Sequence, residues 1–543
     1  MPTSTAPHPR RSARLVAAAL ALLACPAWAQ SPPAPPPGPP PASQPSKPQP
    51  SKPQTSPPPS SRTAEEQAEA IQQRAFAALD RGDHAQAADL LREAIRTDAS
   101  NFVFYYNLAC VLALQHKQAE SADMLIDAVE HGFVDYRQLT TDPQLALTRR
   151  EPRIAKLLES WPTVAQRHRD ANLRAAERMF EDKQARYQST LEERLRIAVM
   201  SAMDAKSTEQ ARADLAGLFD WGVLHVFPEL AEKAASDRDA WCVVILPTPR
   251  DFLRWIVSTY GADAVNSFAG IGGSYIHDQK RLVAQDLGAT LRHEFFHVLH
   301  WRSMSRLGQE HPIWIQEGLC SLVEDYEPGP TGKPEELKPV PSWRSNMARR
   351  IMTGGKLLPI KQLAALPRER FTGSSPLANY AQARTFFLYL YSAGKLKEWY
   401  ATYTTDLPGG YAADRSGVRA IEVVFGKPIA EVDKAYKTWL RALPDVAEQN
   451  KPGAATLSVD VEQGDGDGPV IAAIPKDERN RPNPARRAGL RVGDVITAID
   501  GKPTRDLNEL VRLLGEKQAG DEVEVSYRRG KAHATTRVAL VPR

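Results

Sequence analysis

Between residues 66 and 133 the small and apolar positions follow a helical pattern that repeats every 34 residues. A repeat of this length holds two helices and their turns, so the pattern predicts two consecutive helical hairpins. Small residues at matched positions let the paired helices approach closely. The matched positions are Ala75 with Ala109, Ala87 with Ser121, Leu91 with Leu125 and Ala94 with Ala128.

This period and these small residues resemble tetratricopeptide repeats. The match departs from the family at the first turn, where Gly82 is matched by His116, and at Ala99, where the family often has proline. We assign residues 63–160 to this helical region. The resemblance implies a groove for a peptide or a protein partner. The alternative is that the hairpins only pack on the next domain.

The pattern changes after residue 160. Residues 163–200 are charged and favour a helix, which we expect to be a connecting helix. The run "AWCVVILP" at 240–247 is short, apolar and rich in β-branched residues, so it predicts a buried strand. A helical segment "DFLRWIVSTYG" follows, and "GGSYIHDQKRLVAQDL" then predicts two strands around the turn "HDQK".

The segment "TLRHEFFHVLHW" at 290–301 carries the candidate chemistry. His293 and His297 are four residues apart, which places both on one face of a helix. Two imidazoles in this spacing, with Glu294 between them, are typical of a zinc site. A catalytic zinc ion takes three protein ligands and keeps one position open. Glu317 follows His297 by 20 residues, which leaves room for a loop and a second helix that returns a carboxylate.

The pair of motifs, His293-Glu294-x-x-His297 and Trp314-Ile-x-Glu317-Gly318, resembles the gluzincin metallopeptidases, the group of thermolysin and the zinc aminopeptidases. The resemblance covers about residues 200–445 and implies that His293, His297 and Glu317 bind one zinc ion. It implies that Glu294 is the general base. Such a ligand set lowers the pKa of zinc-bound water to about 7. We assign residues 161–448 to this domain, including its connecting helix.

Three further features bear on this site. His300 falls near the same helix face as His293, and we interpret it as a packing or supporting histidine because Glu317 is the stronger third ligand. Tyr380 in "NYAQARTFFLYL" resembles the gluzincin tyrosine that donates to the oxyanion of the tetrahedral intermediate, with an ordinary buried tyrosine as the alternative. The segment "AGIGGSYI" occupies the place where gluzincins bind substrate along an edge strand. It lacks the glutamate motif that holds a free amino terminus, which favours cleavage inside chains.

Residues 455–543 resemble a bacterial PDZ domain. The run "VITAIDG" alternates like a strand that ends in a tight turn, and "LNELVRLL" is the helix that flanks the peptide groove in that family. PDZ domains bind a peptide as an added strand and hold its terminal carboxylate with backbone amides. A ligand with a free carboxyl terminus is therefore implied, and a purely structural domain that caps the peptidase is the alternative.

The N-terminus predicts export. Arg10, Arg11 and Arg14 precede the apolar run 15–24, and small residues at Ala27 and Ala29 indicate a signal peptide over 1–29. In a competing interpretation "LLAC" is a lipoprotein signal and Cys25 carries the lipid. Residues 30–62 form a linker, because 15 prolines occur in the 30 positions from 31 to 60 and cannot pack into a core. The mature chain then contains no predicted membrane span.

The net charge and the cysteines argue against a nucleic-acid-binding protein and against a disulfide-stabilised fold. The net charge is +4 from 69 basic and 65 acidic residues, without a basic stripe interleaved with aromatics, so nucleic acid is not an expected partner. Cys110, Cys242 and Cys320 are too scattered for a disulfide framework, and we expect buried thiols.

The sequence thus predicts a multidomain α+β protein with helical hairpins, a mixed-sheet gluzincin-like domain and a barrel-like PDZ domain. Its predicted function is that of an exported zinc metallopeptidase in a bacterial periplasm or cell envelope. The repeats and the PDZ domain would recruit protein substrates or partners. The alternative is a catalytically silent envelope scaffold that binds partners through the same two modules.

Overall fold

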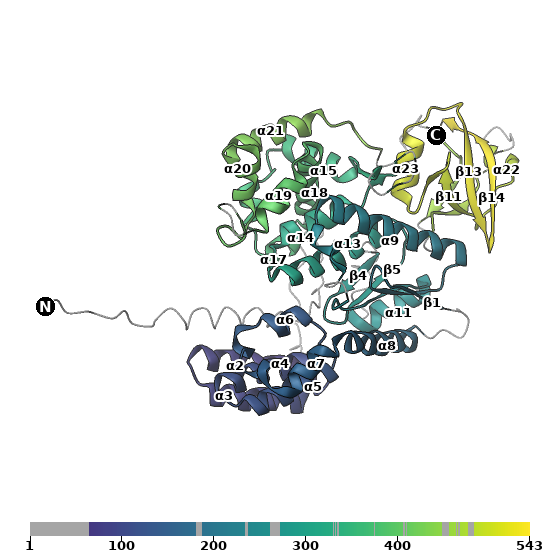
Figure 1. The fold of residues 1–543 in the computed structure, drawn as a ribbon. Helices are drawn as coiled ribbons and strands as arrows, with labels where there is room; N and C mark the ends of the chain where they lie inside the picture. The colour runs from purple at the N-terminus through teal and green to yellow at the C-terminus, as the bar shows by residue number, and fades with distance from the viewer. Residues whose placement is uncertain are drawn as a thin grey trace, which may run out of the picture. The chain divides into compact units, whose positions relative to one another are not determined.

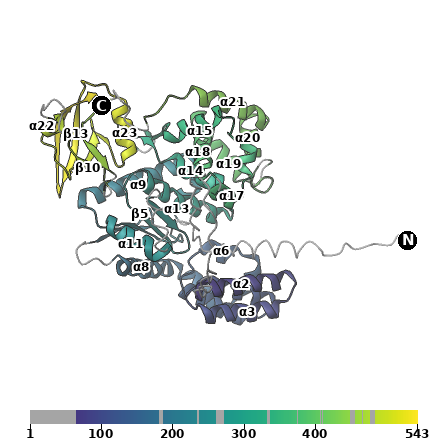
Figure 2. The same ribbon diagram turned by 180° about the vertical axis from the view of Figure 1, so that it is seen from behind.

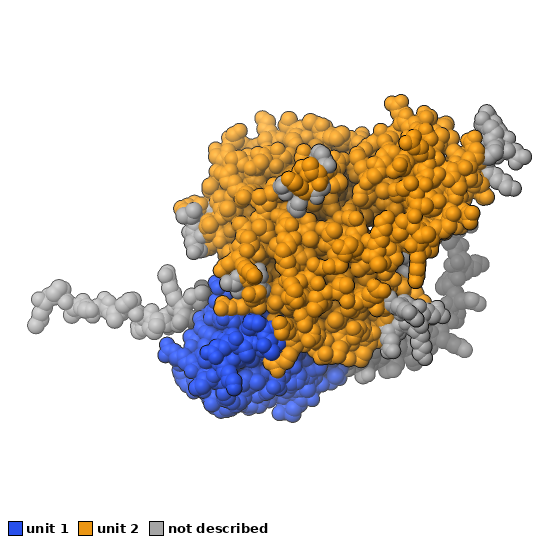
Figure 3. All heavy atoms as spheres, turned by 45° about the vertical axis from the view of Figure 1, so that its right-hand side comes forward, with its two compact units in different colours: residues 1–164 blue, residues 165–543 orange. Residues whose placement is uncertain are grey.

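The computed structural model describes residues 64–542, with gaps at 181–186, 234–236, 261–271, 330, 332, 334–335, 374, 406–407, 409, 448–454, 463, 465–466 and 476–482. The described chain forms two compact units, which meet in sequence at Val164 and Ala165 (Figure 3). The predicted signal peptide, the lipid site at Cys25 and the proline-rich linker lie outside the described residues.

Unit 1 is entirely helical over its described residues. Its first four helices form two antiparallel hairpins, α2 with α3 and α4 with α5, and shorter helices follow. The elements are α2 Ala64–Asp80, α3 His84–Thr97, α4 Phe102–Leu114, α5 Gln118–Glu130, α6 Tyr136–Thr141, η1 Pro143–Leu145, η2 Thr148–Arg150 and α7 Pro152–Glu159. Helix α8, Trp161–Met179, begins at the end of this unit.

The period of 34 residues corresponds to packing positions in these hairpins. All eight residues of the four matched pairs have 0 % exposure, so the repeat marks the faces where helices meet. Ser121, which replaces an alanine, donates its hydroxyl to the Ala109 carbonyl at 2.7 Å and so leaves no unsatisfied group. Gly82 and His116 both have positive φ, at 78° and 60°, so the two turns have similar backbones despite the residue change.

Unit 2 contains a five-stranded mixed sheet in the order β1-β2-β3-β5-β4. The central strands β2, β3 and β5 are parallel, and the outer strands β1 and β4 run antiparallel to their neighbours. Every residue of β3 is buried, because both faces of the sheet are covered by helices. The strands are β1 Gln188–Glu192, β2 Ile197–Ser201, β3 Cys242–Leu246, β4 Gly273–Ile276 and β5 Arg281–Ala284.

The predicted buried strand at 240–247 and the two strands around "HDQK" are confirmed as β3, β4 and β5. The continuous helix expected over 163–200 is wrong in its second half. Helix α8 ends at Met179, and β1 and β2 follow. The run "IAVM" in β2 is buried on both faces, and burial in the sheet outweighs the helical preference of the charged residues around it.

Helices cover both faces of this sheet. Helices α8 and α11, Pro249–Tyr260, share an apolar core with one face of the sheet, through Ala176, Phe252, Trp255 and Ile256. Helices α9, Ala205–His225, and α13, Ala289–Leu307, lie on the other face (Figure 1). The helix predicted around the motif is thus confirmed as α13.

The chain continues from α13 into a helical region. Its elements are α14 Ile313–Leu322, the short strands β6 Tyr326–Glu327 and β7 Lys338–Pro339, α15 Trp343–Thr353, α16 Ile360–Ala364, α17 Arg368–Gly373, α18 Pro376–Ser392, α19 Leu396–Tyr403, α20 Val418–Phe425 and α21 Ile429–Ala442; η3 Pro228–Ala231 follows α9. Helix α14 packs on both α13 and α18, which brings together the segments that carry the candidate site.

The C-terminal module of unit 2 is built on an antiparallel sheet in the order β14-β13-β11-β10-β9, with β12 beside β11 and a separate pair β8 with β15. Its elements are β8 Ala455–Thr456, β9 Asp460–Glu462, β10 Val470–Ala473, α22 Pro484–Arg487, β11 Val495–Ile499, β12 Lys502–Pro503, α23 Leu507–Gly515, β13 Glu522–Arg529, β14 Ala532–Ala539 and β15 Val541–Pro542. Apolar residues of α23, among them Leu510, Leu513 and Leu514, close the core of the module.

The chain is a multidomain α+β protein, as predicted: a helical region, a mixed sheet with helices, and a C-terminal antiparallel sheet. Cys110, Cys242 and Cys320 are buried free thiols, which confirms that prediction. Among the described helices, none is long and apolar enough to cross a membrane.

Candidate metal centre

Helix α13 positions both histidines of the motif. Leu291, Phe295 and Val298 are buried against the rest of the unit, and this packing fixes the rotation of the helix. His293 and His297, one turn apart, then project from the same face. Their Nε2 atoms lie 3.1 Å apart, and their side chains are 12 % and 13 % exposed.

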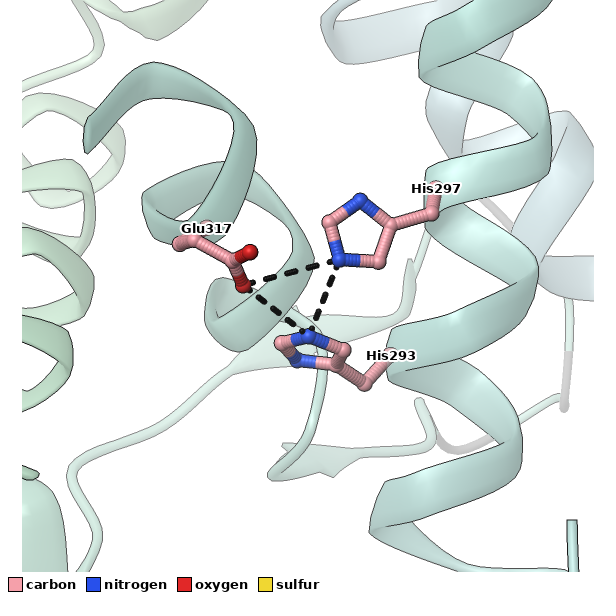
Figure 4. Close-up of side chains that lie close together, drawn as sticks. All are labelled: His293, His297 and Glu317. Atoms are coloured by element: carbon pink, nitrogen blue, oxygen red, sulfur yellow. Dashed lines mark hydrogen bonds and ion pairs between the residues drawn. The ribbon is translucent and has the colours of Figure 1, made fainter. Parts of the chain in front are cut away.

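Helix α14 brings the third group to the two imidazoles. The Oε2 atom of Glu317 lies 3.3 Å from Nε2 of His293 and 3.5 Å from Nε2 of His297 (Figure 4). Donor atoms bound tetrahedrally at about 2.0–2.1 Å from one zinc ion are about 3.3 Å from one another. The three residues therefore have both the chemistry and the spacing of a zinc ligand set. Among the described residues, this is the one cluster of histidine, cysteine and acidic groups with such an arrangement.

The electrostatics of the cluster favour a bound cation. Burial alone would lower the pKa of His293, but hydrogen bonds to Glu317 and Glu324 outweigh it and raise that pKa to about 10. Burial would raise the pKa of Glu317, yet His297 and His293 hold it well below its usual range. The carboxylate is thus ionised at neutral pH and is stabilised by positive charge beside it. A proton on His293 supplies that charge in the metal-free protein, and a bound metal ion would replace this proton.

Glu324, which the sequence analysis did not identify, binds the ring nitrogen of His293 that faces away from Glu317. Nδ1 of His293 donates to Oε1 of Glu324 at 2.9 Å, which directs Nε2 toward Glu317. Arg344 of α15 holds the same carboxylate through two hydrogen bonds of 2.6 and 2.9 Å. Burial opposes ionisation, but Arg344 and His293 lower the pKa of Glu324 to about 2. The sequence feature that could have pointed to Glu324 is its position in the acidic segment "LVEDYE", just after α14.

Glu294 lies beside the cluster and outside its donor set. Its Oε2 atom accepts the backbone N–H of Tyr275 at 2.7 Å. Tyr275 belongs to β4, whose outer edge carries no further strand among the described residues. The carboxylate is therefore held between the histidine helix and β4, the edge strand of the sheet among the described residues. The segment "AGIGGSYI" is described here only from residue 272 onward.

Tyr380 lies in the first half of α18, next to the cluster. Burial, followed by the charge of Glu317, raises its pKa well above 10, although Arg344 opposes this shift. The guanidinium carbon of Arg344 lies 5.8 Å from the centre of the tyrosine ring. Tyr380 therefore stays protonated at neutral pH and can donate a hydrogen bond, as an oxyanion donor must.

His300 is placed apart from the three candidate ligands. It is fully buried, and its Nε2 atom lies 2.8 Å from Nδ1 of His311. Its ring stacks on Phe227 at 5.3 Å between centres. Burial lowers the pKa of His300 well below the usual value, so it is a neutral packing residue.

Comparisons with known proteins bear mainly on the C-terminal module. Residues 458–540 match the family model of the PDZ domain. Over 80 residues the chain is 34 % identical to proteins described as "Probable periplasmic serine endoprotease DegP-like" from Brucella suis biovar 1 and Brucella melitensis biotype 1. The match covers 14 % of this chain and 14 % of each relative, so the chain spans about a seventh of their length.

Two solved structures show local or weak similarity. The HtrA-type protease AlgW with a decapeptide is 20 % identical, with a TM-score of 0.15, over 21 % of this chain and 34 % of that chain. An aminopeptidase N family protein from Idiomarina loihiensis is 13 % identical, with a TM-score of 0.22, over 66 % of this chain and 68 % of that chain. The C-terminal module is thus a PDZ domain by its sequence match.

Proposed function

We propose that this chain is an exported, zinc-dependent metallopeptidase that hydrolyses peptide bonds in protein or peptide substrates. The observation that carries the proposal is the convergence of His293, His297 and Glu317, with the carboxylate of Glu294 beside them and outside the donor set. A scaffold that needed metal only for stability would require the three ligands. For a scaffold, the use of the fourth group would be limited to its hydrogen bond with the backbone of Tyr275.

In this proposal each residue has a defined role. His293, His297 and Glu317 hold one zinc ion per chain, which supplies Lewis-acid polarisation of the scissile carbonyl and acidifies water. Glu294 accepts the proton of the attacking water and returns it to the leaving amine. A substrate strand bound along β4 would place its backbone next to Glu294. Tyr380 donates to the developing oxyanion.

The role of Tyr380 predicts a defined kinetic defect. Tyr380→Phe is expected to lower kcat by about 10²- to 10³-fold with little change in KM, because one donor to the oxyanion is lost only in the transition state. Tyr389→Phe, on the same helix and packed on Phe425, is the matched control and should retain normal kcat. Equal rates for Tyr380→Phe and wild type would assign Tyr380 a packing role.

The N-terminal segment, the PDZ domain and the helical hairpins bear on where the enzyme acts and which partners it binds. The N-terminal basic and apolar pattern supports export, and the periplasmic description of the relatives matched by the PDZ domain agrees with it. We propose that the PDZ domain binds peptide carboxyl termini and that the helical hairpins of unit 1 bind a protein partner. The predicted boundaries, including 161–448 for the peptidase domain, remain part of this proposal.

Reversible metal removal tests the proposed function. Dialysis of the full chain against a chelator should abolish hydrolysis of an unfolded protein substrate such as casein. One equivalent of zinc should restore it. Activity that survives complete removal of metal would reject a zinc peptidase. Full zinc occupancy without hydrolysis of any substrate would favour the scaffold.

A further inference from the structure

Helix α23 of the PDZ domain meets the N-terminal end of the metal-site helix α13. Oδ2 of Asp506 accepts the N–H of Ala289, the first residue of α13, at 3.1 Å. Oδ1 of the same carboxylate accepts the N–H of Glu509 at 2.9 Å and caps α23. One side chain therefore satisfies a free amide at the start of both helices.

The close approach of Asp506 to α13 occurs at a glycine, Gly288. A Cβ atom at Gly288 would overlap Oδ2 of Asp506, so any other residue there would displace the Asp506 carboxylate or the start of α13. Figures 1 and 2 both show α23 on the side of the PDZ domain that faces α9 and α13. The start of α23 and the start of α13 are thus in direct van der Waals and hydrogen-bond contact.

A buried ion pair crosses the same contact. Nη2 of Arg292 donates to Oε1 of Glu509 at 2.8 Å, and the two side chains are 1 % and 7 % exposed. Arg292 directly precedes the candidate ligand His293. Oε2 of Glu509 accepts the N–H of Arg505, so the carboxylate is fixed at both oxygens. Removing the charge of Glu509 leaves the buried Arg292 guanidinium without this carboxylate partner, so the pair holds the PDZ helix to the metal-site helix.

Arg292 continues this connection to the metal site. Its Nε and Nη2 atoms both donate to the backbone carbonyl of Glu324. The carboxylate of Glu324 in turn accepts Nδ1–H of His293. Glu509 therefore places Arg292, Arg292 fixes the backbone of Glu324, and Glu324 orients a candidate ligand. Each of these steps is a direct hydrogen bond; Glu509, Arg292 and Glu324 are buried, and His293 is partly buried.

Neighbouring groups strengthen the contact. Nη2 of Arg505, just before α23, lies 2.6 Å from the Asp214 carboxylate of α9. The guanidinium groups of Arg292 and Arg505 lie 4.9 and 6.0 Å from the ring centre of Tyr326. These contacts surround the Arg292–Glu509 pair with protein rather than water, where the attraction between charges is strongest.

We infer that Glu509 of the PDZ domain is a positioning residue for the metal centre, acting through Arg292 and Glu324 on His293. The inference rests on the proposed zinc site. It gives the PDZ domain a second role besides ligand binding: helix α23 becomes part of the support of the metal ligands. Because this helix flanks the peptide groove in PDZ domains, the groove and the metal centre share one structural element.

Zinc affinity of the full chain is the test, measured by competition with a chromogenic chelator. Glu509→Gln keeps the shape of the side chain and removes its charge. It should weaken zinc binding about tenfold, at the lower end of the loss in affinity seen when residues that hydrogen-bond metal ligands are replaced. Glu516→Gln is the control, because Glu516 directly follows α23, is 42 % exposed, and forms its ion pairs with Lys502 and Arg512 of the PDZ domain. It should bind zinc like wild type.

A second readout separates positioning from simple loss of stability. Cobalt substituted for zinc gives an absorption spectrum that depends on ligand geometry, and Glu509→Gln should alter it while Glu516→Gln should not. If Glu509→Gln does not fold, Glu509→Asp, which keeps the charge but withdraws it by one methylene, should show the altered spectrum. A folded Glu509 variant with wild-type zinc affinity and cobalt spectrum would overturn the inference.

The outcomes also separate this inference from the proposed function. Zinc binding that depends on Glu509, in a protein that cleaves no peptide, would support the positioning role and reject the peptidase. Cleavage and zinc binding that both ignore Glu509 would support the peptidase and reject the positioning role. Failure of wild type to bind zinc would reject both.

Discussion

Replacing Glu294 by glutamine is expected to lower kcat by about 10²- to 10⁴-fold while one zinc ion stays bound per chain. Glutamine has the same shape and can still accept the N–H of Tyr275, so the local structure should be retained. It cannot take a proton from water. The donor atoms of His293, His297 and Glu317 are untouched, and for that reason metal content should not change.

The measurement pairs steady-state kinetics with metal analysis by mass spectrometry. Glu310→Gln is the control, because it makes the same charge change at an exposed residue in the loop between α13 and α14. Loss of zinc together with activity would mean that Glu294 belongs to the ligand set. Normal kcat with zinc bound would mean that another group is the base.

Replacing His297 by alanine is expected to weaken zinc binding by more than about 100-fold. This exceeds the loss in affinity expected when a residue that only hydrogen-bonds a metal ligand is replaced. Nε2 of His297 is one of three donor atoms, and without it two protein ligands remain. Activity should disappear with the metal. Equilibrium dialysis against buffered zinc measures the effect directly.

His300→Gln is the informative comparison for this variant. His300 is buried against His311 and Phe227, so its loss should affect packing while zinc remains bound. If His300→Gln released zinc and His297→Ala kept it, the assignment of the ligands would be wrong.

The sequence predicted those parts of the site that depend on local periodicity. Four residues between His293 and His297 fix a common helix face whatever the rest of the chain does. The interval to Glu317 left room for one loop and one helix, and the structure has α14 in that interval. The apolar run of β3 and the turn between β4 and β5 were likewise readable, because burial and turn chemistry act over a few residues.

The parts that the sequence missed depend on contacts between distant segments. Glu324 lies just beyond the last turn of α14, where no helical period fixes the direction of its side chain. Arg292 and Glu509 are 217 positions apart, and each alone looks like a charge on a solvated helix face. The strands β1 and β2 were read as helix because "IAVM" is only four residues long within a charged, helix-favouring region.

The most direct test of the zinc peptidase is cleavage of a diverse peptide mixture, followed by mass spectrometry, with zinc-loaded wild type beside zinc-loaded Glu294→Gln. The account predicts new fragments with wild type and intact peptides with the variant, and the fragment ends will distinguish internal from terminal cleavage. An unchanged mixture with both proteins, each with zinc bound, would contradict it.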